Sequence, residues 1–175
     1  RRADGSYFAA LDTETRDSLE FYVEAVDRLR TAIESFRPHF DFIILDTPPS
    51  LGLLAVNALT AADAVLVPIQ CEYFALEGVS ELLSTIRRVT SALNPALELA
   101  GIVLTMYDDR MKLTRDVERE VREHFPGKVF EAVVPRNVRL AEAPSHGLPI
   151  LQYDIKSRGA EAYLAVAREL LRRTR

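Results

Sequence analysis

The chain has 175 residues, of which 48% are hydrophobic and 27% are charged, a composition typical of one soluble globular domain. Its formal net charge of −4 argues against a surface that is basic throughout, although a local basic patch remains compatible with it. A single cysteine, Cys71, excludes an internal disulfide and a cysteine-based zinc cage, which favours a reducing, cytoplasmic compartment. No apolar run approaches the length of a membrane span.

The first part of the chain predicts a lead, a helix and a buried strand. Residues 1–16 show no clear periodicity, and we expect them to form a poorly ordered lead. Apolar residues then recur at helical spacing from Leu19 to Phe36, and Pro38 would stop this helix. The unbroken apolar run Phe42–Leu45 is typical of a strand buried on both faces of a parallel sheet, and Asp46 would lie at its carboxyl end.

Helical and strand patterns alternate along the rest of the chain. In order, they predict a helix over 51–59, a strand over Ala64–Val67 closed by Pro68, a helix from Val79 to Leu93, a strand over Leu99–Leu104, a helix capped by Thr114 and ended near Gly127, a strand over Val129–Val134 closed by Pro135, a loop over 136–156, and a last helix that packs through Tyr163, Leu164, Ala167, Leu170 and Leu171. This alternation predicts an α/β fold with a largely parallel sheet flanked by helices. We expect residues 17–175 to form the βα units of a single domain.

The strand that ends at Asp46 also has the pattern of a Walker B element. In P-loop nucleotidases, an apolar strand ends in an aspartate whose carboxylate acts on magnesium. Many buried strands end in aspartate, so the pattern alone leaves a plain strand end open. Thr47, Pro48 and Pro49 would leave the sheet as a stiff loop, because proline lacks the amide donor that a central strand needs.

Further motifs follow Asp46 in a fixed order. They are Asp46–Leu54 with Asn57–Leu59, Val67–Gly78, Leu104–Asp108, Val134–Leu140, Glu142–Gly147 and Gly159–Tyr163. Together they resemble the ParA (Soj) family of DNA-partitioning ATPases, from about Asp41 to the end of the chain. Residues 1–40 match only by a helix in the expected place. The resemblance implies a P-loop nucleotidase fold of the deviant Walker, ParA/MinD-like type.

The phosphate loop of that family has no counterpart in the sequence. The family has a glycine-rich turn with two lysines, whereas the seven glycines of this chain are isolated. A triphosphate needs a nest of backbone amides and a lysine. We therefore expect the chain to correspond to the carboxyl-terminal part of a ParA-type protein lacking the P-loop, and to be inactive alone. The run Phe42–Leu45 would then be an exposed apolar edge, prone to aggregation or dimerisation.

The resemblance also implies roles for individual residues. Asp46 would act on Mg²⁺, through a water molecule, and Pro135 and Asn137 would hold the adenine of ATP, with Thr105 a weaker candidate for the same pocket. The candidate switch II residues are Thr47, Pro48, Pro49, Ser50 and Gly52, and the candidates for sequence-independent DNA binding are Arg110 and Arg139.

The function that this resemblance implies is ATP hydrolysis in chromosome or plasmid partitioning. ATP binding would drive homodimerisation, the dimer would bind DNA nonspecifically, and a ParB-type centromere-binding protein would stimulate hydrolysis. Such a protein would be cytoplasmic and nucleoid-associated, with no membrane partner. The alternative is a non-enzymatic fragment or paralogue that binds DNA or a partner without the nucleotide motor. A membrane-acting MinD-type protein is a more distant alternative.

Overall fold

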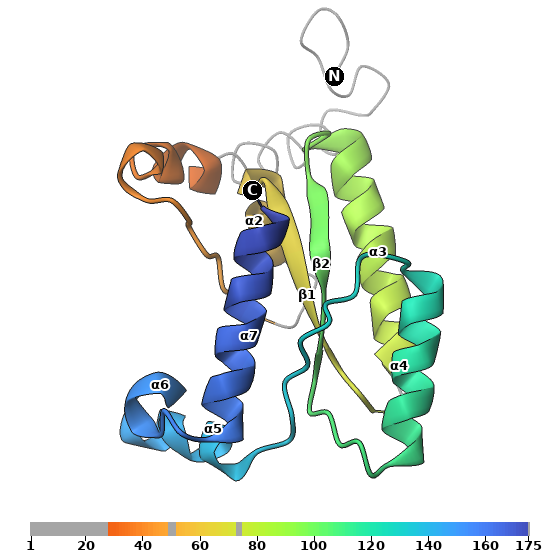
Figure 1. The fold of residues 1–175 in the computed structure, drawn as a ribbon. Coiled ribbons are helices and arrows are strands. Elements are labelled where there is room, and N and C mark those ends of the chain that lie inside the picture. Colours follow the sequence, from red (N-terminus) through yellow and green to blue (C-terminus); the bar gives the residue numbers. More distant parts are fainter. Residues whose placement is uncertain (1–27, 49–51, 73–74, 175) are drawn as a thin grey trace, which may run out of the picture. The chain divides into compact units, whose positions relative to one another are not determined.

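A computed structural model describes residues 28–48, 52–72 and 75–174 of the chain (Figure 1). These residues belong to two compact units. The first unit takes the described part of Arg1–Ala64 together with Leu82–Glu98, and the second takes the described part of Val65–Glu81 and Leu99–Arg175. The expected lead, 1–16, and most of the first predicted helix lie outside the described residues. The expectation of one domain stays a prediction.

The described helices of the first unit lie where the sequence predicts helices, except for one 3-10 helix that includes Pro38, the residue expected to stop the first helix. Residues 28–34 are helical, the 3-10 helix η1 follows over Arg37–His39, and α2 spans Leu53–Ala61. The helix α3, over Ala75–Ala92, ends just before Asn94, as predicted. Asn94 is buried, and its side-chain amide donates to the carbonyl oxygens of Leu59 at 3.0 Å and Ala62 at 2.7 Å. These bonds tie the end of α3 to the end of α2, because they satisfy two of the orphan carbonyls there.

The prediction of a buried strand over Phe42–Leu45 is wrong. The structure assigns no strand there, and Phe42, Ile43 and Ile44 are all exposed, Ile44 by 84%. A strand needs a neighbour to pair its backbone groups. The backbone of residues 42–48 makes no hydrogen bond to any residue that the structure describes. The apolar pattern indicates a segment that suits the interior of a sheet. No strand lies beside this segment in the part of the chain that the structure describes, so it forms none itself.

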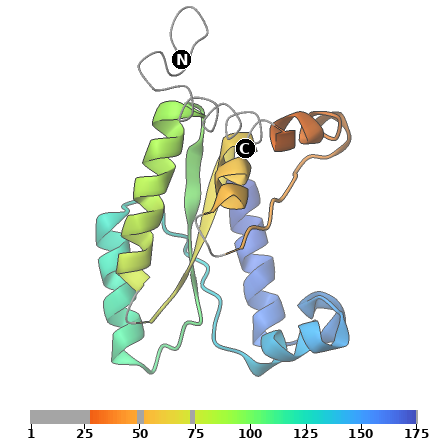
Figure 2. The same ribbon diagram turned by 180° about the vertical axis from the view of Figure 1, so that it is seen from behind.

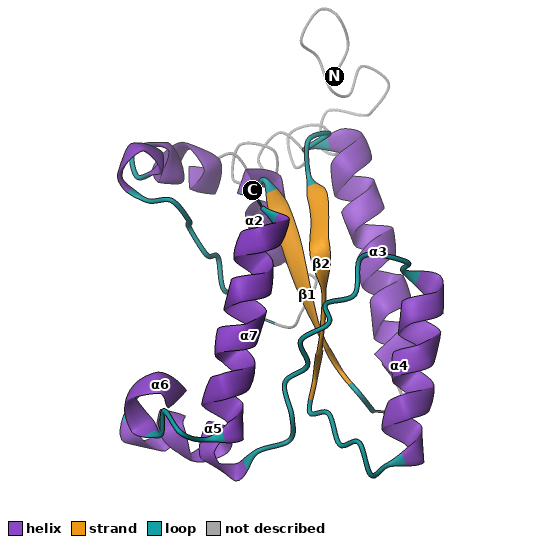
Figure 3. Cartoon of the chain, viewed as in Figure 1, coloured by secondary structure: helices purple, strands orange, loops and turns teal. Residues whose placement is uncertain are grey.

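The second unit contains a parallel two-stranded sheet, β1 over Ala64–Gln70 and β2 over Glu98–Thr105 (Figure 3). Both strands were predicted, but β1 does not end at Pro68. It continues to Gln70, and its last residues lead to a bond from the Cys71 amide to the Thr105 carbonyl at 3.0 Å. Proline is tolerated because β1 is an edge strand of the described sheet, where an amide donor can be missing.

A crossing segment, residues 127–136, runs along the other edge of β2. The strand predicted over Val129–Val134 lies in this segment, but the structure assigns no strand there. The segment forms two isolated parallel bridges with β2 and its extension, Ile102 with Val129 and Tyr107 with Pro135. The segment passes between α4, over Lys112–His124, and α7, over Arg158–Arg173, which lie on either side of the strands in both views (Figures 1 and 2). Its side chains Phe130 and Val134 form a core cluster with Val103 of β2 and Val166 of α7.

The part of the chain after β2 differs from the predictions in the start of one helix and in one expected loop. The helix α4 begins at Lys112, two residues before the predicted cap Thr114, which lies buried in the first turn. The predicted loop over 136–156 contains three short helices, α5 over Val138–Glu142, η2 over Ala143–His146 and α6 over Ile150–Tyr153. Their lengths of four or five residues are too short for a helical period to stand out in the sequence. None of the described helices is long and apolar enough to cross a membrane.

The packed face of α7 agrees with the predicted one only in part. Leu170 packs against the core cluster, as predicted, whereas Tyr163, Ala167 and Leu171, which the sequence also places on the buried face, are exposed. The buried residues of the helix are Gly159, Ala160, Val166 and Glu169. Hydrophobic periodicity missed Gly159 and Glu169 because one is a glycine and the other is an acid.

Candidate functional site

The carboxyl end of β2 turns sharply before it rejoins the crossing segment. The Thr105 hydroxyl donates to the Ile69 carbonyl at 3.1 Å, across the end of the sheet. Met106 then adopts a left-handed backbone, with φ of 53°, which is uncommon for a residue with a Cβ atom. After this turn, the Tyr107 amide donates to the Val134 carbonyl at 3.1 Å, and its carbonyl accepts from the Arg136 amide at 3.0 Å. The left-handed backbone at Met106 therefore directs the chain back toward the crossing segment.

This pairing brings the three candidate adenine-binding residues to one end of the second unit. Pro135 is bridged to Tyr107, two residues beyond Thr105. Asn137 follows as the N-cap of α5, where its Oδ1 accepts from the Arg139 amide at 2.8 Å. The Nδ2 of Asn137 makes no hydrogen bond to a described residue, so this donor is available to a ligand. Carboxyl ends of parallel strands are where ligands bind in open α/β sheets.

The first candidate DNA-binding residue, Arg110, is held by an acid two positions before it. Its guanidinium donates to both carboxylate oxygens of Asp108, from Nε at 2.9 Å and from NH2 at 2.7 Å. These bonds lower the pKa of Asp108 to about 2. The Arg110 side chain is 85% exposed, so its positive charge faces solvent while one of its edges is occupied.

Arg139, the second candidate, lies on α5 in a small polar cluster. Its NH1 donates to Glu142 Oε2 at 2.9 Å, and its Nε lies 3.5 Å from Asp154 Oδ2. The Tyr153 hydroxyl donates to the same Glu142 oxygen at 3.2 Å, and the His146 ring stacks on the Tyr153 ring at 4.9 Å between centroids. Each candidate arginine therefore has an acidic partner within the chain, with which a phosphate would compete.

The candidate magnesium and switch residues lie in the first unit. Asp46, Thr47 and Pro48 are exposed on the segment that forms no strand, whereas Pro49 and Ser50 lie outside the described residues. Gly52 is the N-cap of α2. The Asp46 carboxylate makes no hydrogen bond or ion pair with a described residue. No three acidic, histidine or cysteine side chains gather into a metal-binding group among the residues that the structure describes.

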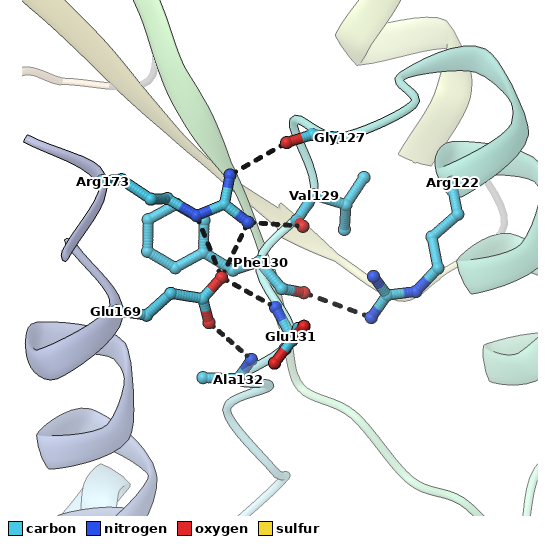
Figure 4. A network of polar contacts seen from close by, with 8 residues as sticks. All are labelled: Arg122, Gly127, Val129, Phe130, Glu131, Ala132, Glu169 and Arg173. Carbon is cyan, nitrogen blue, oxygen red and sulfur yellow. Dashed lines mark hydrogen bonds and ion pairs between the residues drawn. The ribbon is translucent and has the colours of Figure 1, made fainter.

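A buried polar network, which the sequence did not reveal, holds the crossing segment (Figure 4). From α7, Glu169 accepts hydrogen bonds from the amides of Glu131 at 3.0 Å and Ala132 at 2.9 Å. Arg173, one turn later, donates to Glu169 at 2.7 Å and to the Val129 carbonyl at 2.9 Å. The spacing of Glu169 and Arg173 indicates a helical ion pair, but no sequence signal shows that this acid is buried.

A second polar group lies between β2 and α4. The Tyr107 hydroxyl donates to Glu118 at 2.5 Å, and this bond, followed by burial, raises the pKa of Tyr107 to about 12. The other Glu118 oxygen accepts from Arg122 at 2.9 Å. Cys71 is buried, as expected of a small core residue, and burial with the nearby Glu118 charge raises the pKa of its thiol to about 11. The thiol is therefore protonated at neutral pH and unsuited to nucleophilic chemistry.

Comparison with known proteins assigns the chain to a family. A profile described as AAA domain matches residues 11–99. The ParA chromosome partitioning protein of Caulobacter vibrioides is 55% identical over 85% of this chain and 56% of its own length. The Soj sporulation initiation inhibitor protein of Bacillus subtilis is 55% identical over 82% of this chain and 56% of its own length.

Among solved structures, a cobyrinic acid a,c-diamide synthase of Mycobacterium smegmatis with bound ATP analogue and magnesium aligns with a TM-score of 0.72 and 37% identity. The alignment covers 86% of this chain and 55% of that one. The chain thus belongs to the AAA domain family, with an α/β fold in which helices flank a parallel sheet. Within this class it is a member of the ParA (Soj) family of partitioning proteins, and it spans about half the length of the curated relatives that it matches.

Proposed function

We propose that the chain serves in a ParA-type ATPase that partitions a chromosome or plasmid. The observation that carries this proposal is the 55% identity over 85% of the chain to a protein named for chromosome partitioning. ATP binding would drive dimerisation, the dimer would bind DNA nonspecifically, and a ParB-type protein would stimulate hydrolysis. The protein would act in the cytoplasm, in association with the nucleoid.

The adenine of ATP is assigned to the end of the second unit, at Pro135 and Asn137 with Thr105 beside them. In support, the Oδ1 of Asn137 caps α5, and its Nδ2 makes no hydrogen bond to a described residue. An amide donor next to a proline ring matches what a purine offers, an acceptor nitrogen on its edge and an apolar face. Thr105 is the weaker candidate, because its hydroxyl already donates to Ile69.

Magnesium is assigned to Asp46, through a water molecule. Mg²⁺ is commonly bound by one or two carboxylates together with substrate phosphates and several waters, so a metal-binding cluster of protein side chains is not required. The Asp46 carboxylate is exposed and makes no hydrogen bond or ion pair with a described residue, which fits this single role. When bound, the ion would neutralise charge on the phosphates during phosphoryl transfer. Thr47, Pro48, Pro49, Ser50 and Gly52 would change conformation with the nucleotide state.

DNA binding is assigned to Arg110 and Arg139. Both guanidinium groups are solvent-accessible, and each is paired with acidic side chains, Arg110 with Asp108 and Arg139 with Glu142 and Asp154. Exposed ion pairs of this kind contribute little to stability, on the order of 1 kcal/mol or less. A DNA phosphate can therefore replace the carboxylate at small cost, and binding of this type weakens steeply with salt.

An NMR titration of the chain with Mg-ATP tests the adenine assignment. We expect weak binding, because the sequence supplies no phosphate loop, with chemical shift changes at Thr105 and at 135–137. An Asn137→Asp variant keeps the Oδ1 cap acceptor but turns the free donor into an acceptor, so it should lose those changes. Glu161→Gln, an exposed change on α7, serves as the control. Changes that spare 135–137 would refute the assignment.

The second candidate is a non-enzymatic module that binds DNA or a partner. It is favoured by the isolated glycines, which provide no phosphate nest, and by the position of Asp46 on a segment that forms no strand. Fluorescence anisotropy with labelled random-sequence DNA, at several salt concentrations, separates the two. The module should bind DNA equally with and without Mg-ATP, and Arg139→Ala should lower the salt slope by about one, while Arg119→Ala should not. Tight, magnesium-dependent ATP binding would rule the module out.

A further inference from the structure

The pairing between β2 and the crossing segment changes register part-way along. At the bridge of Ile102 with Val129, the Ile102 amide donates to the Lys128 carbonyl and the Phe130 amide donates to the Ile102 carbonyl, at 2.9 and 2.8 Å. In a regular parallel ladder, the next amide to reach β2 would be that of Ala132, at the Leu104 carbonyl. The Val134 amide takes that place instead, at 2.8 Å. The crossing segment is therefore advanced by two residues at Leu104.

The amide that this shift removes from the ladder, that of Ala132, is one of the two that Glu169 accepts. The Ala132 amide donates to Glu169 Oε2 and the Glu131 amide to Oε1. Figure 4 shows the carboxylate reaching from α7 to these two consecutive amides. A buried amide without a partner costs about 1–3 kcal/mol, so the bulge requires an acceptor from outside the sheet. Glu169 provides one for each amide.

The carboxylate is itself fixed in place. The Glu169 side chain is 6% exposed and pairs with Arg173, whose guanidinium lies 4.4 Å from the centroid of the Phe130 ring. Arg173 also donates to the carbonyls of Gly127 at 3.0 Å and Val129 at 2.9 Å, just before the bulge. From the opposite side, Arg122 on α4 donates to the Phe130 carbonyl at 3.1 Å. The segment is thus held on both flanks of the register change.

We propose that Glu169 is a positioning residue that sets the register of the crossing segment, and so the place of Asn137 and Arg139 at the end of the sheet. A shift of two residues leaves the same faces inward and outward, so the regular register is a compatible competitor. Adopting it would move the following residues by about 6.6 Å along the strand direction. The core opposes this slip, because Ala132 would replace the buried Val134.

The effect on function depends on the roles proposed for Asn137 and Arg139. The control of the register by Glu169 does not depend on those roles. Both residues follow the bulge by only a few positions, and Arg136 is bonded to Tyr107 across the pairing that the bulge creates. A carboxylate thirty or more positions later in the sequence therefore controls where a base-contacting amide and a phosphate-contacting guanidinium lie.

The test compares Glu169→Ala with Glu169→Gln and Glu161→Gln in the full chain. Glu169→Gln retains a side-chain oxygen that can accept an amide, and Glu161→Gln alters an exposed acid of the same helix. NMR amide exchange and nuclear Overhauser contacts report the register directly. For Glu169→Ala we expect amide exchange at Glu131 to rise by roughly tenfold or more, because this amide loses its acceptor. We also expect a contact of Leu104 with Ala132, whose amide would take the Leu104 carbonyl in place of Val134, and shifted signals for Asn137 and Arg139.

Glu169→Gln should keep the Leu104 contact to Val134, which distinguishes register control from a general loss of stability. If Glu169→Ala does not fold, Glu169→Gln and Glu169→Ser are compared by the same contacts, with serine too short to reach the amides. A Glu169→Ala or Glu169→Ser chain that keeps only the contact of Leu104 with Val134, and unmoved Asn137 and Arg139 signals, would overturn the proposal. Fluorescence anisotropy of the Arg139→Ala variant with DNA tests the proposed DNA binding without reference to the register. Failure of the register proposal can therefore be distinguished from failure of the proposed function.

Discussion

Replacing Arg173 by methionine should destabilise the chain far more than the same change at its neighbour Arg172. The Arg173 guanidinium makes an ion pair with the buried Glu169 and donates to the carbonyls of Gly127 and Val129. Arg172 is exposed and makes no hydrogen bond or ion pair with any residue that the structure describes. Methionine keeps most of the apolar stem in both variants, so the comparison isolates the charged group.

The expected cost of Arg173→Met is about 3–4 kcal/mol. Breaking a buried ion pair by removing one partner typically costs 3–5 kcal/mol, and the low end applies because Glu169 keeps its two amide donors. The contact with the Phe130 ring adds about 0.5–1 kcal/mol. Arg172→Met should stay within about 0.5 kcal/mol, as surface changes do.

Urea denaturation followed by circular dichroism measures both variants against the unchanged chain. The midpoint should fall strongly for Arg173→Met without a change in slope, because the same surface is exposed on unfolding. Arg173→Lys should recover part of the loss, since ammonium restores the charge but not the planar fork. Equal midpoints for the Arg172 and Arg173 variants would show that the network does not hold the crossing segment.

Three further outcomes follow from the structure. Burial raises the pKa of Glu169, but the amides of Ala132 and Glu131 and the Arg173 charge outweigh burial, so the pKa in the folded chain is lowered. The stability that ionised Glu169 contributes is complete above its unfolded pKa of about 4.3 and is lost as pH falls through its folded pKa. Glu169→Gln should therefore make the free energy of unfolding less dependent on pH in the acid range. Gly159→Ala should lower the thermal midpoint, because its Cβ would lie 2.6 Å from Leu140 Cγ, and Leu140→Ala should restore part of the loss rather than add to it. Ile44→Lys should make the chain more soluble, or more monomeric as measured by light scattering, because Ile44 is 84% exposed. If self-association is unchanged, the surface through which the chain associates lies elsewhere.

The sequence predicted most elements of the fold, because long periodic segments carry their own signal. The helices α2, α3, α4 and α7 and the strands β1 and β2 appear where apolar spacing placed them. The strand Phe42–Leu45 failed for a different reason. Its composition indicates that the segment would suit the interior of a sheet. Whether an adjacent strand is present to pair with it depends on other residues of the chain.

The candidate site was predicted in part. The convergence of Thr105, Pro135 and Asn137 follows from strand ends meeting at one side of a sheet, which sequence order alone indicates. The bulge beside them was not predictable, because it depends on Glu169, an acid on a helix whose buried face reads as polar. Only the path of the chain in space shows which amides that acid faces.

Asn137 carries a consequence for how selectivity at this site can change. The same side chain starts α5 through its Oδ1 and presents its Nδ2 outward. Any replacement that alters the outward hydrogen-bonding group while lacking an acceptor for the Arg139 amide also unravels the short helix that carries Arg139. The nucleobase preference can therefore change at this position only through residues that keep a cap acceptor, such as aspartate, and other changes in preference would have to come from the neighbours of Asn137.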